Sequence, residues 1–317
     1  MTRLIPNHVQ IETINGVCTS KCIMCNFKEW TRKPRIMSYE EFCGLMRKFE
    51  PHSEAIDYFT FHGDGEPLLD KNLPDKIAFA KDHGFKGLGL ATNCTELDEK
   101  MSLRLLEARL DTLICSVDGV RKQTHEAIRV GTDFDEVVAN VRRFIALRDS
   151  RYPGGTRVLV RFIRQQINYD EWEPFHALWS GRVCRDKGDD VIRFDVHNCA
   201  GSVEDYENKA CDDDPIGGYV CSYLFDRLII FSDGRVALCP PDANGYFDHG
   251  NVFEDDPIAI FNDEHFTRYR TFMQAGRGGE LEHCRTCTLP RSNSKKTNPE
   301  AMQHSSAGAF DASGGRE

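Results

Sequence analysis

Three cysteines stand close together near the N-terminus, at Cys18, Cys22 and Cys25. They share one short loop between an apolar run at 9–14 and a helical pattern that starts near Ser38. A closed structural zinc site normally takes four ligands, so three thiolates suit it poorly. Thiolates are the usual ligands of cubane iron–sulfur clusters, and a set of three leaves one iron open. The loop therefore favours such a cluster, while a zinc site shared with a remote CxxC, or simple reduced thiols, are the alternatives.

The pattern of apolar residues predicts a fold of alternating strands and helices. Strand-like runs separated by helical segments indicate right-handed βαβ units and a parallel sheet. Functional residues collect at the carboxyl ends of such strands. We therefore examine the residues that follow each strand. The predicted strands are 9–14, 56–61, 85–91, 112–117, 157–163 and 191–196, and the predicted helices begin near 38 and cover 72–83, 98–108, 134–148 and 171–178.

Composition narrows the class of protein. At 317 residues and 40% hydrophobic content, the chain can form one large α/β domain plus a small appendage. A net charge of −10 argues against a nucleic-acid or anionic-membrane surface. No apolar run approaches the ~20 residues of a transmembrane helix, and the first residues lack a signal-peptide core. Thirteen cysteines without an export signal indicate metal ligands and reduced thiols, so we expect a cytoplasmic protein.

The CxxxCxxC loop resembles that of the radical S-adenosylmethionine (SAM) enzymes. The resemblance implies a (βα)6 partial barrel in which Cys18, Cys22 and Cys25 hold a [4Fe–4S] cluster. The open iron then binds the methionine end of SAM, whose reductive cleavage releases a 5′-deoxyadenosyl radical. A flavodoxin or ferredoxin reductant is implied too. One position departs from the family: Met24 stands where relatives usually have an aromatic residue, although a thioether can also pack against adenine.

Two predicted turns, one with two glycines and one with an asparagine, resemble SAM-binding motifs of this family. After the second predicted strand, Gly63, Gly65 and Glu66 resemble the GGE motif, in which backbone carbonyls and the Glu hold the SAM ammonium. An ordinary glycine-rich turn is the alternative. After the third strand, Asn93 stands in a Thr-Asn-Gly motif and is expected to bond the SAM ribose. Cys94 replaces the glycine of that motif, so the turn is expected to differ.

A third motif follows the fourth predicted strand. Ser116 and Asp118 resemble the family's Ser-x-Asp-Gly, which places Ser116 near the SAM carboxylate or ribose and lets Asp118 orient the loop. Arg129 resembles the family arginine that pairs with the SAM carboxylate. Guanidinium–carboxylate pairing is strong and directional, so arginine suits that role. An exposed cation at a helix end is the alternative.

After the sixth strand, His197 and Cys199 face the expected mouth of the barrel. Relatives often have Asn-Trp-x-Gly here, so Cys199 is a substitution where substrate should lie. A direct role in catalysis and a buried, space-filling thiol are both open. Cys43 and Cys115 fall on predicted core faces and are expected to pack there. Cys94, Cys184 and Cys211 have no assigned role.

The last quarter of the chain carries four more cysteines. Cys221 and Cys239 flank a predicted β-hairpin that turns near Gly234. A helical run over 258–272 and the pair Cys284 and Cys287 follow. This Cx12Gx4C–CxxC pattern resembles the twitch domain, a shortened SPASM extension that carries one auxiliary [4Fe–4S] cluster, and is especially similar to radical SAM 2-deoxy-scyllo-inosamine dehydrogenases of aminoglycoside biosynthesis. A structural zinc at the same thiolates is the alternative.

These resemblances imply domains at 1–205 (barrel), 206–290 (twitch) and a disordered tail at 291–317. Four thiolates saturate an auxiliary cluster, which favours an electron relay. The leading hypothesis is oxidation of a secondary alcohol of a sugar or aminocyclitol to a ketone. His197, Asp195 or His62 are candidates to accept the hydroxyl proton.

Other reactions remain open. Hydrogen-atom donation by Cys199 would make the enzyme an epimerase. A peptide-modifying maturase and a cluster carrier without radical turnover are further alternatives. Acidic side chains in predicted loops suit an aminated, cationic sugar or are ordinary solvated surface. Those side chains are Asp212, Asp213, Asp214, Asp242 and Asp248.

Overall fold

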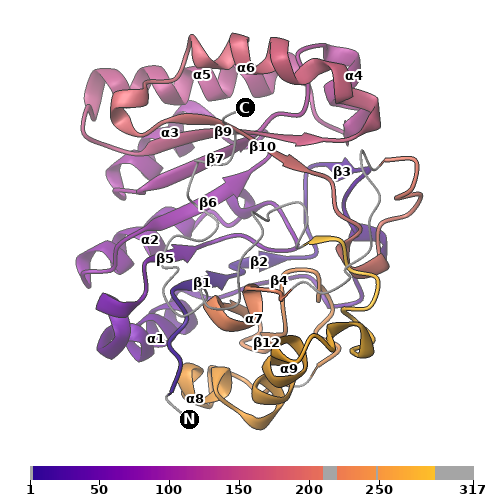
Figure 1. Ribbon diagram of the computed structural model, residues 1–317. Helices are drawn as coiled ribbons and strands as arrows, with labels where there is room; N and C mark the ends of the chain where they lie inside the picture. The colour runs from indigo at the N-terminus through magenta and orange to yellow at the C-terminus, as the bar shows by residue number, and fades with distance from the viewer. Residues whose placement is uncertain (1–2, 210–219, 248, 290–317) are drawn as a thin grey trace.

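A computed structural model describes residues 3–209, 220–247 and 249–289 of the chain. An eight-stranded sheet organises these residues, in the order β10-β9-β7-β6-β5-β1-β11-β12 (Figure 1). All neighbouring strands are parallel except the last pair, β11 and β12, which is antiparallel. The predicted α/β fold with a mostly parallel sheet is therefore confirmed. Cys211, the acidic run 212–214, Asp248 and the predicted tail 291–317 lie outside the described residues.

The strands of the large sheet begin and end close to the predicted bounds. They are β1 (His8–Ile11), β5 (Tyr58–Thr60), β6 (Leu88–Thr92), β7 (Thr112–Ser116), β9 (Arg157–Arg164), β10 (Asp190–Asp195), β11 (Arg227–Ile230) and β12 (Val236–Ala237). Two small ribbons pair β2 (Ile14–Asn15) with β4 (Arg35–Ile36) and β3 (Lys21–Cys22) with β8 (Arg129–Val130). The helices are α1 (Tyr39–Phe49), α2 (Leu73–Asp82), α3 (Glu99–Glu107), α4 (Lys122–Ile128), α5 (Phe134–Arg151), α6 (Trp172–Ser180), α7 (Tyr223–Asp226), α8 (Pro257–Phe261) and α9 (Glu264–Gln274).

Side-chain caps fix where most of the longer helices begin. Ser38 and Glu41 form a reciprocal capping box at the start of α1. Asp98, Asp133 and Asp263 each accept a backbone hydrogen bond at the start of α3, α5 and α9. The cap at Asp263 explains why the helical run predicted over 258–272 is two helices. Helix α4 was not predicted.

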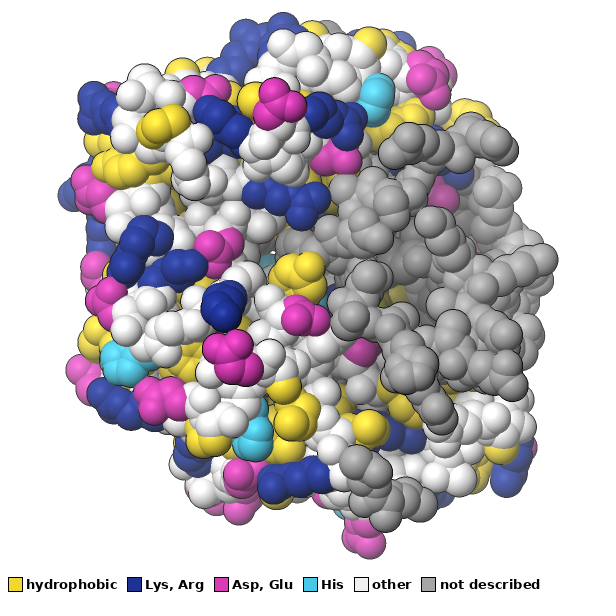
Figure 2. Space-filling model, turned by 60° about the vertical axis from the view of Figure 1, so that its left-hand side comes forward, with side chains coloured by type: hydrophobic (Ala, Val, Ile, Leu, Met, Phe, Trp, Pro, Cys, Tyr) yellow, Lys and Arg dark blue, Asp and Glu magenta, His cyan; other side chains and the backbone are white. Residues whose placement is uncertain are grey.

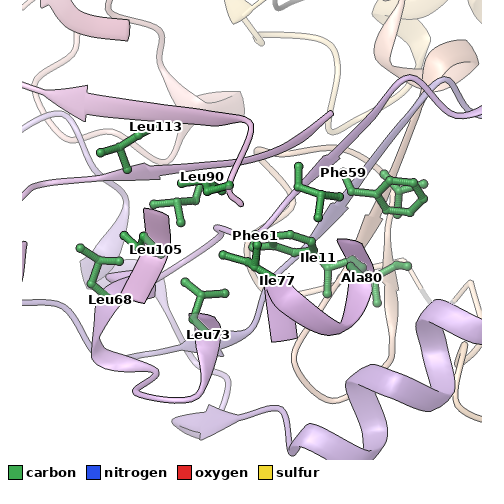
Figure 3. Packing of buried hydrophobic residues seen from close by; sticks show 14 of the residues in the cluster. Ile11, Phe59, Phe61, Leu68, Leu73, Ile77, Ala80, Leu90, Leu105 and Leu113 are labelled. Carbon is green, nitrogen blue, oxygen red and sulfur yellow. The ribbon is translucent and has the colours of Figure 1, made fainter. Parts of the chain in front are cut away.

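The hydrophobic core lies between the sheet and the helices that follow its strands. Leu90 of β6, Phe59 of β5 and Ile77 of α2 meet in one cluster (Figure 3). In Figure 1, α1, α2, α5 and α6 lie at the periphery and the strands lie inside them. Cys115 is buried in this core, and Cys43 is buried on α1, as expected. Because the helices cover the outer face, the inner face and the carboxyl ends of the strands are left to form a site.

The C-terminal segment extends the main sheet. Strand β11 pairs in parallel with β1, with Arg227 opposite His8 and Ile230 opposite Ile11. The predicted hairpin of β11 and β12 is present, and its first strand forms a further wall beside the barrel strands. Helices α7 to α9 lie near this hairpin (Figure 1). The residues of the C-terminal cysteine pattern are thereby held close to the inner face of the sheet.

The surface carries both signs of charge. Figure 2 shows basic and acidic side chains interspersed over the face in view, and many surface arginines and lysines pair with carboxylates, as Arg104 does with Asp75. None of the described helices has the length and apolar character to cross a membrane. Asp242, expected in a substrate-facing or solvated loop, is instead buried, where its carboxylate accepts hydrogen bonds from the backbone nitrogens of Leu238 and Tyr246.

Candidate active site and cluster sites

A cavity of about 430 Å³ opens at the carboxyl ends of the parallel strands. It brings together residues that are far apart in the sequence, from the cysteine loop to β11. Its volume falls in the usual range for small-molecule sites, about 300–1,000 Å³. The polar and sulfur-containing residues that line it include Cys18, Cys22, Cys25, His62, Asp64, Glu66, Asn93, Ser116, Arg129, Arg161, Asp195, His197, Cys199 and Arg227.

The cysteine loop is fixed to the strand that carries Arg129. Strands β3 and β8 pair antiparallel, with Cys22 opposite Arg129. The Arg129 Nη1 atom lies 3.6 Å from the Cys22 sulfur. Ser20 Oγ lies 3.3 Å from the same sulfur and 3.7 Å from that of Cys18. Polar donors therefore surround the sulfurs at the mouth of the cavity.

The three thiols of this loop fit an iron–sulfur cluster. All three line one wall of the cavity, and burial is the main cause that raises the pKa of Cys18 and of Cys25. Buried thiols become thiolates only beside a positive centre, which bound iron provides. Three thiolates supply three of the four cluster ligands and leave the fourth position facing the cavity.

A second, smaller cavity collects the four C-terminal cysteines. Cys221, Cys239, Cys284 and Cys287 all line it. Burial raises the pKa of each thiol, to about 12 for Cys221 and Cys284. In the described part of the chain, no three Cys, His, Asp or Glu side chains converge closely enough for a single metal ion. A cubane cluster instead binds each thiolate at a different iron, so four thiols around one cavity fit it.

The two cavities share a wall. Tyr223, Pro241 and Leu289 line both of them. Cys199 lines the large cavity, where burial, and after it the charges of Asp64 and of Cys287, raises its pKa to about 12. The four-cysteine site therefore adjoins the space in which a substrate would bind.

The glycines of the GGE-like turn are required by close packing. A Cβ on Gly63 would lie 2.7 Å from Glu12 Cγ, and one on Gly65 would lie 2.9 Å from the carbonyl oxygen of Val17. Glu66 is buried and accepts hydrogen bonds from Thr92 Oγ1 (2.6 Å) and from the Asn93 backbone (2.9 Å). The Glu66 carboxylate thus joins two strand ends and still lines the cavity.

Asn93 lies against the cysteine loop. Its Nδ2 atom donates to Thr19 Oγ1 at 2.8 Å and lies 3.7 Å from the Cys18 sulfur, and its Oδ1 accepts from the Thr95 backbone at 3.0 Å. The amide is therefore engaged by the protein, whereas the sequence predicted a bond to the SAM ribose. The following residue, Cys94, has a φ of 65°, a left-handed conformation that glycine adopts more easily.

Arg129 is buried and forms an ion pair with Asp118, with 2.7 Å between Nη2 and Oδ2. The alternative of an exposed cation is wrong. Asp118 Oδ1 also accepts the backbone hydrogen of Ile163 at 2.7 Å, so this carboxylate joins β7 to β9. Ser116 accepts a 2.7 Å hydrogen bond from Arg161 Nη2. Arg161 lines the cavity, and sequence reasoning missed it although a charge interrupts an otherwise apolar strand there.

Two histidines line the cavity in the neutral state. Burial, and after it the charge of Arg161, lowers the pKa of His62 to about 3 and of His197 to about 4. His197 Nδ1 lies 3.5 Å from the Cys199 sulfur. Asp195 is held by Arg164 Nε at 2.6 Å. The lowered pKa leaves both imidazoles neutral near pH 7, with a ring lone pair but weak basicity, and Asp195 is already paired.

Sequence reasoning also missed a buried network behind the cavity. Arg32 donates from both terminal nitrogens to Glu12, at 2.7 Å each, and from Nη2 to Asp64 at 3.2 Å. Its Nε donates to the carbonyl oxygen of Ala243, and its guanidinium lies 3.7 Å above the ring of Phe231. The network connects the cysteine loop, β1 and the C-terminal segment. No sequence motif marks it.

Residues 13–156 match the radical SAM superfamily, and residues 221–288 match the SPASM iron–sulfur cluster-binding domain. An uncharacterized protein of Treponema pallidum is 25% identical over 273 residues, which cover 82% of this chain and 72% of that protein. A probable GTP 3′,8-cyclase of Methanococcus maripaludis is 29% identical over 135 residues, covering 42% of this chain and 44% of the cyclase. The chain thus spans less than half the length of that relative.

Solved structures share the fold. BtrN in complex with AdoMet and 2-DOIA superposes with a TM-score of 0.61 at 18% identity, covering 90% of this chain and 93% of BtrN. Streptococcus suis SuiB bound to precursor peptide SuiA gives a TM-score of 0.66 at 12% identity, covering 95% of this chain and 74% of SuiB. At these identities the likeness concerns the fold alone.

The chain therefore has a radical SAM domain followed by a SPASM-type domain. These domains bring SAM and [4Fe–4S] clusters as cofactors. The predicted domain types and cofactors are confirmed at this level, and the individual ligand and catalytic roles stay predictions.

Proposed function

We propose that the enzyme oxidises a secondary alcohol of a sugar or aminocyclitol to a ketone. One observation carries this proposal: the three-cysteine cavity shares a wall with a cavity lined by four cysteines. Four thiolates saturate a cluster, so no iron is left to bind substrate, and such a cluster suits electron uptake. The fold shared with BtrN, solved with AdoMet and 2-DOIA, supports the choice of substrate class.

In this proposal the cysteine sets hold the two clusters. Cys18, Cys22 and Cys25 hold the SAM-binding cluster, and Cys221, Cys239, Cys284 and Cys287 hold the auxiliary one. When bound, SAM and the clusters supply a hydrogen-abstracting 5′-deoxyadenosyl radical and an acceptor for the second electron of the oxidation. Gly63, Gly65, Glu66, Ser116 and Arg129 orient SAM, and Asn93 acts on the cysteine loop.

The protein must also remove the hydroxyl proton of the substrate. His62 and His197 line the cavity and are neutral, because burial and Arg161 lower the pKa of both side chains. A neutral ring nitrogen has the lone pair that this transfer needs once the carbon has lost its hydrogen atom. Because the lowered pKa makes each ring a weak base, the ring passes the proton on rather than keeping it. Asp195 is less suited to this role because Arg164 already binds its carboxylate. If a histidine removes this proton, substitution of His62 or His197 should reduce the yield of ketone.

The decisive experiment is anaerobic. The protein is reconstituted with iron and sulfide, and about eight irons per chain are expected. It is then incubated with SAM, a reductant such as flavodoxin, and a panel of sugars, sugar acids and aminocyclitols. A product lighter by two hydrogens, formed together with 5′-deoxyadenosine, supports the proposal. Cleavage of SAM with solely isomeric products from every compound in the panel contradicts it.

A second candidate reaction, epimerisation, is favoured by the position of Cys199. Its sulfur faces the same cavity and lies on the side of the auxiliary cysteines. A protonated thiol could return a hydrogen atom to the opposite face of the substrate radical, and the thiyl radical left on Cys199 would regain its thiol with an electron supplied by the auxiliary cluster and a proton from solvent. In deuterated water this reaction yields an isomer with one deuterium on carbon, and Cys199→Ala removes it. Ketone formation that persists in Cys199→Ala identifies the oxidation instead.

A further inference from the structure

Two arginines face the large cavity without a carboxylate partner. Arg161, on β9, donates from Nη2 to Ser116 Oγ, and its buried Nε has no partner. Arg227, the first residue of β11, lies with its guanidinium 4.4 Å from the centre of the Tyr223 ring, and its Nε is likewise buried without a partner. No carboxylate forms an ion pair with either side chain in the part of the chain that the structure describes.

Other arginines in the interior of this protein show a different pattern. Arg32 pairs with Glu12, Arg129 with Asp118, and Arg148 with Asp189. Arg270 lacks such a pair, but it lies outside the cavity, where it stacks on Phe261 and donates to the Leu224 carbonyl. A buried charge is costly unless it is paired and hydrogen-bonded, so two unpaired guanidiniums at one cavity require explanation.

Most of the carboxylates near the pair are already engaged. Asp118 holds Arg129, Glu12 holds Arg32, and Asp195 holds Arg164. Glu66 accepts hydrogen bonds from the end of β6, at Thr92 and Asn93. Asp226 is the exception: burial raises the pKa of this carboxyl to about 6, and the charge of the adjacent Arg227 acts in the opposite direction. The two guanidiniums also act on one shared group, because both of their charges lower the pKa of His62. Positive charge is therefore concentrated around His62 in the interior of the cavity.

We propose that Arg161 and Arg227 form a seat for an anionic group of the substrate, a carboxylate or a phosphate ester. The seat rests on the proposed function and narrows its substrate class to an acidic sugar or cyclitol derivative. Planar guanidinium groups bind such oxyanions through paired, charge-assisted hydrogen bonds. The bound anion forms the direct ion pairs that neither guanidinium makes with a carboxylate of the described residues, and it places the carbon skeleton beside His62.

The carboxylate of SAM is another source of negative charge at this cavity. Arg129 lies 3.6 Å from the Cys22 sulfur, so a cation already stands next to the loop that binds the methionine end of SAM. Arg227 is placed differently, on the C-terminal strand β11 beside His8 of β1. Arg161 lies nearer the SAM side, since it donates to Ser116 and its pKa is lowered by burial and then by the charge of Arg129. The position of Arg227 therefore favours the substrate as the source of the anion, and the test below distinguishes the two sources.

The experiment measures binding to the reconstituted holoenzyme with SAM present, by anaerobic calorimetry. The probes are glucuronate, glucose and inorganic phosphate; the first two differ by a carboxylate in place of a hydroxymethyl group. Glucuronate should bind at least about tenfold more tightly than glucose, and phosphate should compete with it. Arg161→Gln and Arg227→Gln should abolish the difference, whereas Arg161→Lys and Arg227→Lys should keep most of it. Arg104→Gln, an exposed control paired with Asp75, should leave it unchanged.

Three results would overturn the seat. Equal binding of glucuronate and glucose to the unmodified enzyme is the first, and absence of binding by either counts as equal. A preference that survives both glutamine substitutions is the second. The third is a loss of SAM affinity in both glutamine variants with glucuronate binding unchanged, which would place the SAM carboxylate there. Because no turnover is measured, each result is independent of whether the enzyme forms a ketone.

Discussion

The two cysteine sites of this enzyme differ in what surrounds their sulfurs. At the N-terminal site, Ser20, Asn93 and Arg129 place polar atoms within 3.3–3.7 Å of sulfur, and the sulfurs face a cavity of about 430 Å³. At the C-terminal site, apolar side chains surround the sulfurs, among them Leu224, Leu238, Met273 and Leu289. Hydrogen bonds to sulfur and solvent access both tune cluster potentials. The comparison distinguishes an open, polar site from a smaller, apolar one, and the proposed function assigns reaction to the first and electron storage to the second.

The largest effect is expected when one predicted ligand is removed from the open, N-terminal cysteine site. Cys22→Ala should lower the iron content from about eight to about four per chain and abolish formation of 5′-deoxyadenosine, because SAM then has no iron to bind. Iron analysis and chromatography of the nucleoside products measure both effects. Cys43→Ala is the matched control, since Cys43 is a core thiol that lines neither cavity. Unchanged SAM cleavage in Cys22→Ala would show that the open site lies elsewhere.

Removing a ligand from the closed site should have a narrower effect. Cys239→Ala is expected to lose about four irons as well, but to cleave SAM within about tenfold of the unmodified rate. Ketone formation should disappear, because the second electron has no acceptor. Mass spectrometry of the substrate and quantification of 5′-deoxyadenosine separate the two activities. Normal ketone yield in Cys239→Ala would refute the electron-storage role.

Much of this arrangement follows from local sequence patterns. The period of the apolar residues placed the parallel strands, since a buried strand is an uninterrupted apolar run. The cysteine spacings identified both sets of thiols, because each set lies on a short loop or near a hairpin. Gly63 and Gly65 were found for a related reason: backbone segments approach there too closely for a Cβ.

What the sequence could not provide are contacts between distant segments. No sequence pattern near Arg32 or Glu12 predicts the ion pair by which they join the cysteine loop to β1. Arg161 and Arg227 meet at one cavity because β11 joins the sheet beside β1, a pairing that no local pattern predicts. The contacts of Asn93 with Thr19 and Cys18 depend on how the cysteine loop folds over it, which its motif alone does not indicate; its bond to the SAM ribose stays a prediction.

The Arg32 network bears on the comparison because it links the segment that carries the N-terminal cysteines to the C-terminal segment. The side chains of Arg32 and Glu12 are only 5% and 2% exposed, and Arg32 also contacts Asp64, Ala243 and Phe231. Arg32→Met leaves the carboxylates of Glu12 and Asp64 without a cationic partner, which should cost about 3–5 kcal/mol of unfolding free energy. Thermal or denaturant unfolding measures the loss. Arg104→Gln should cost far less, since exposed pairs contribute about 0–1 kcal/mol. Equal decreases in unfolding free energy in the two variants would show that the network does not stabilise the fold more than a surface ion pair does.

The smallest expected effect concerns Asn93, which supports the open site alone. Asn93→Ala removes the donor to Thr19 and Cys18, so the first cluster should lose iron to a chelator about 10–100-fold faster, as for other residues that hold metal ligands. Asn140→Ala is the matched control, because this buried amide bonds the Cys94 carbonyl and leaves the cysteine loop untouched. If Asn93 instead binds the SAM ribose, its substitution will weaken SAM binding while iron loss stays at the rate of the control. The two readouts therefore decide whether this amide serves the cluster or the cofactor.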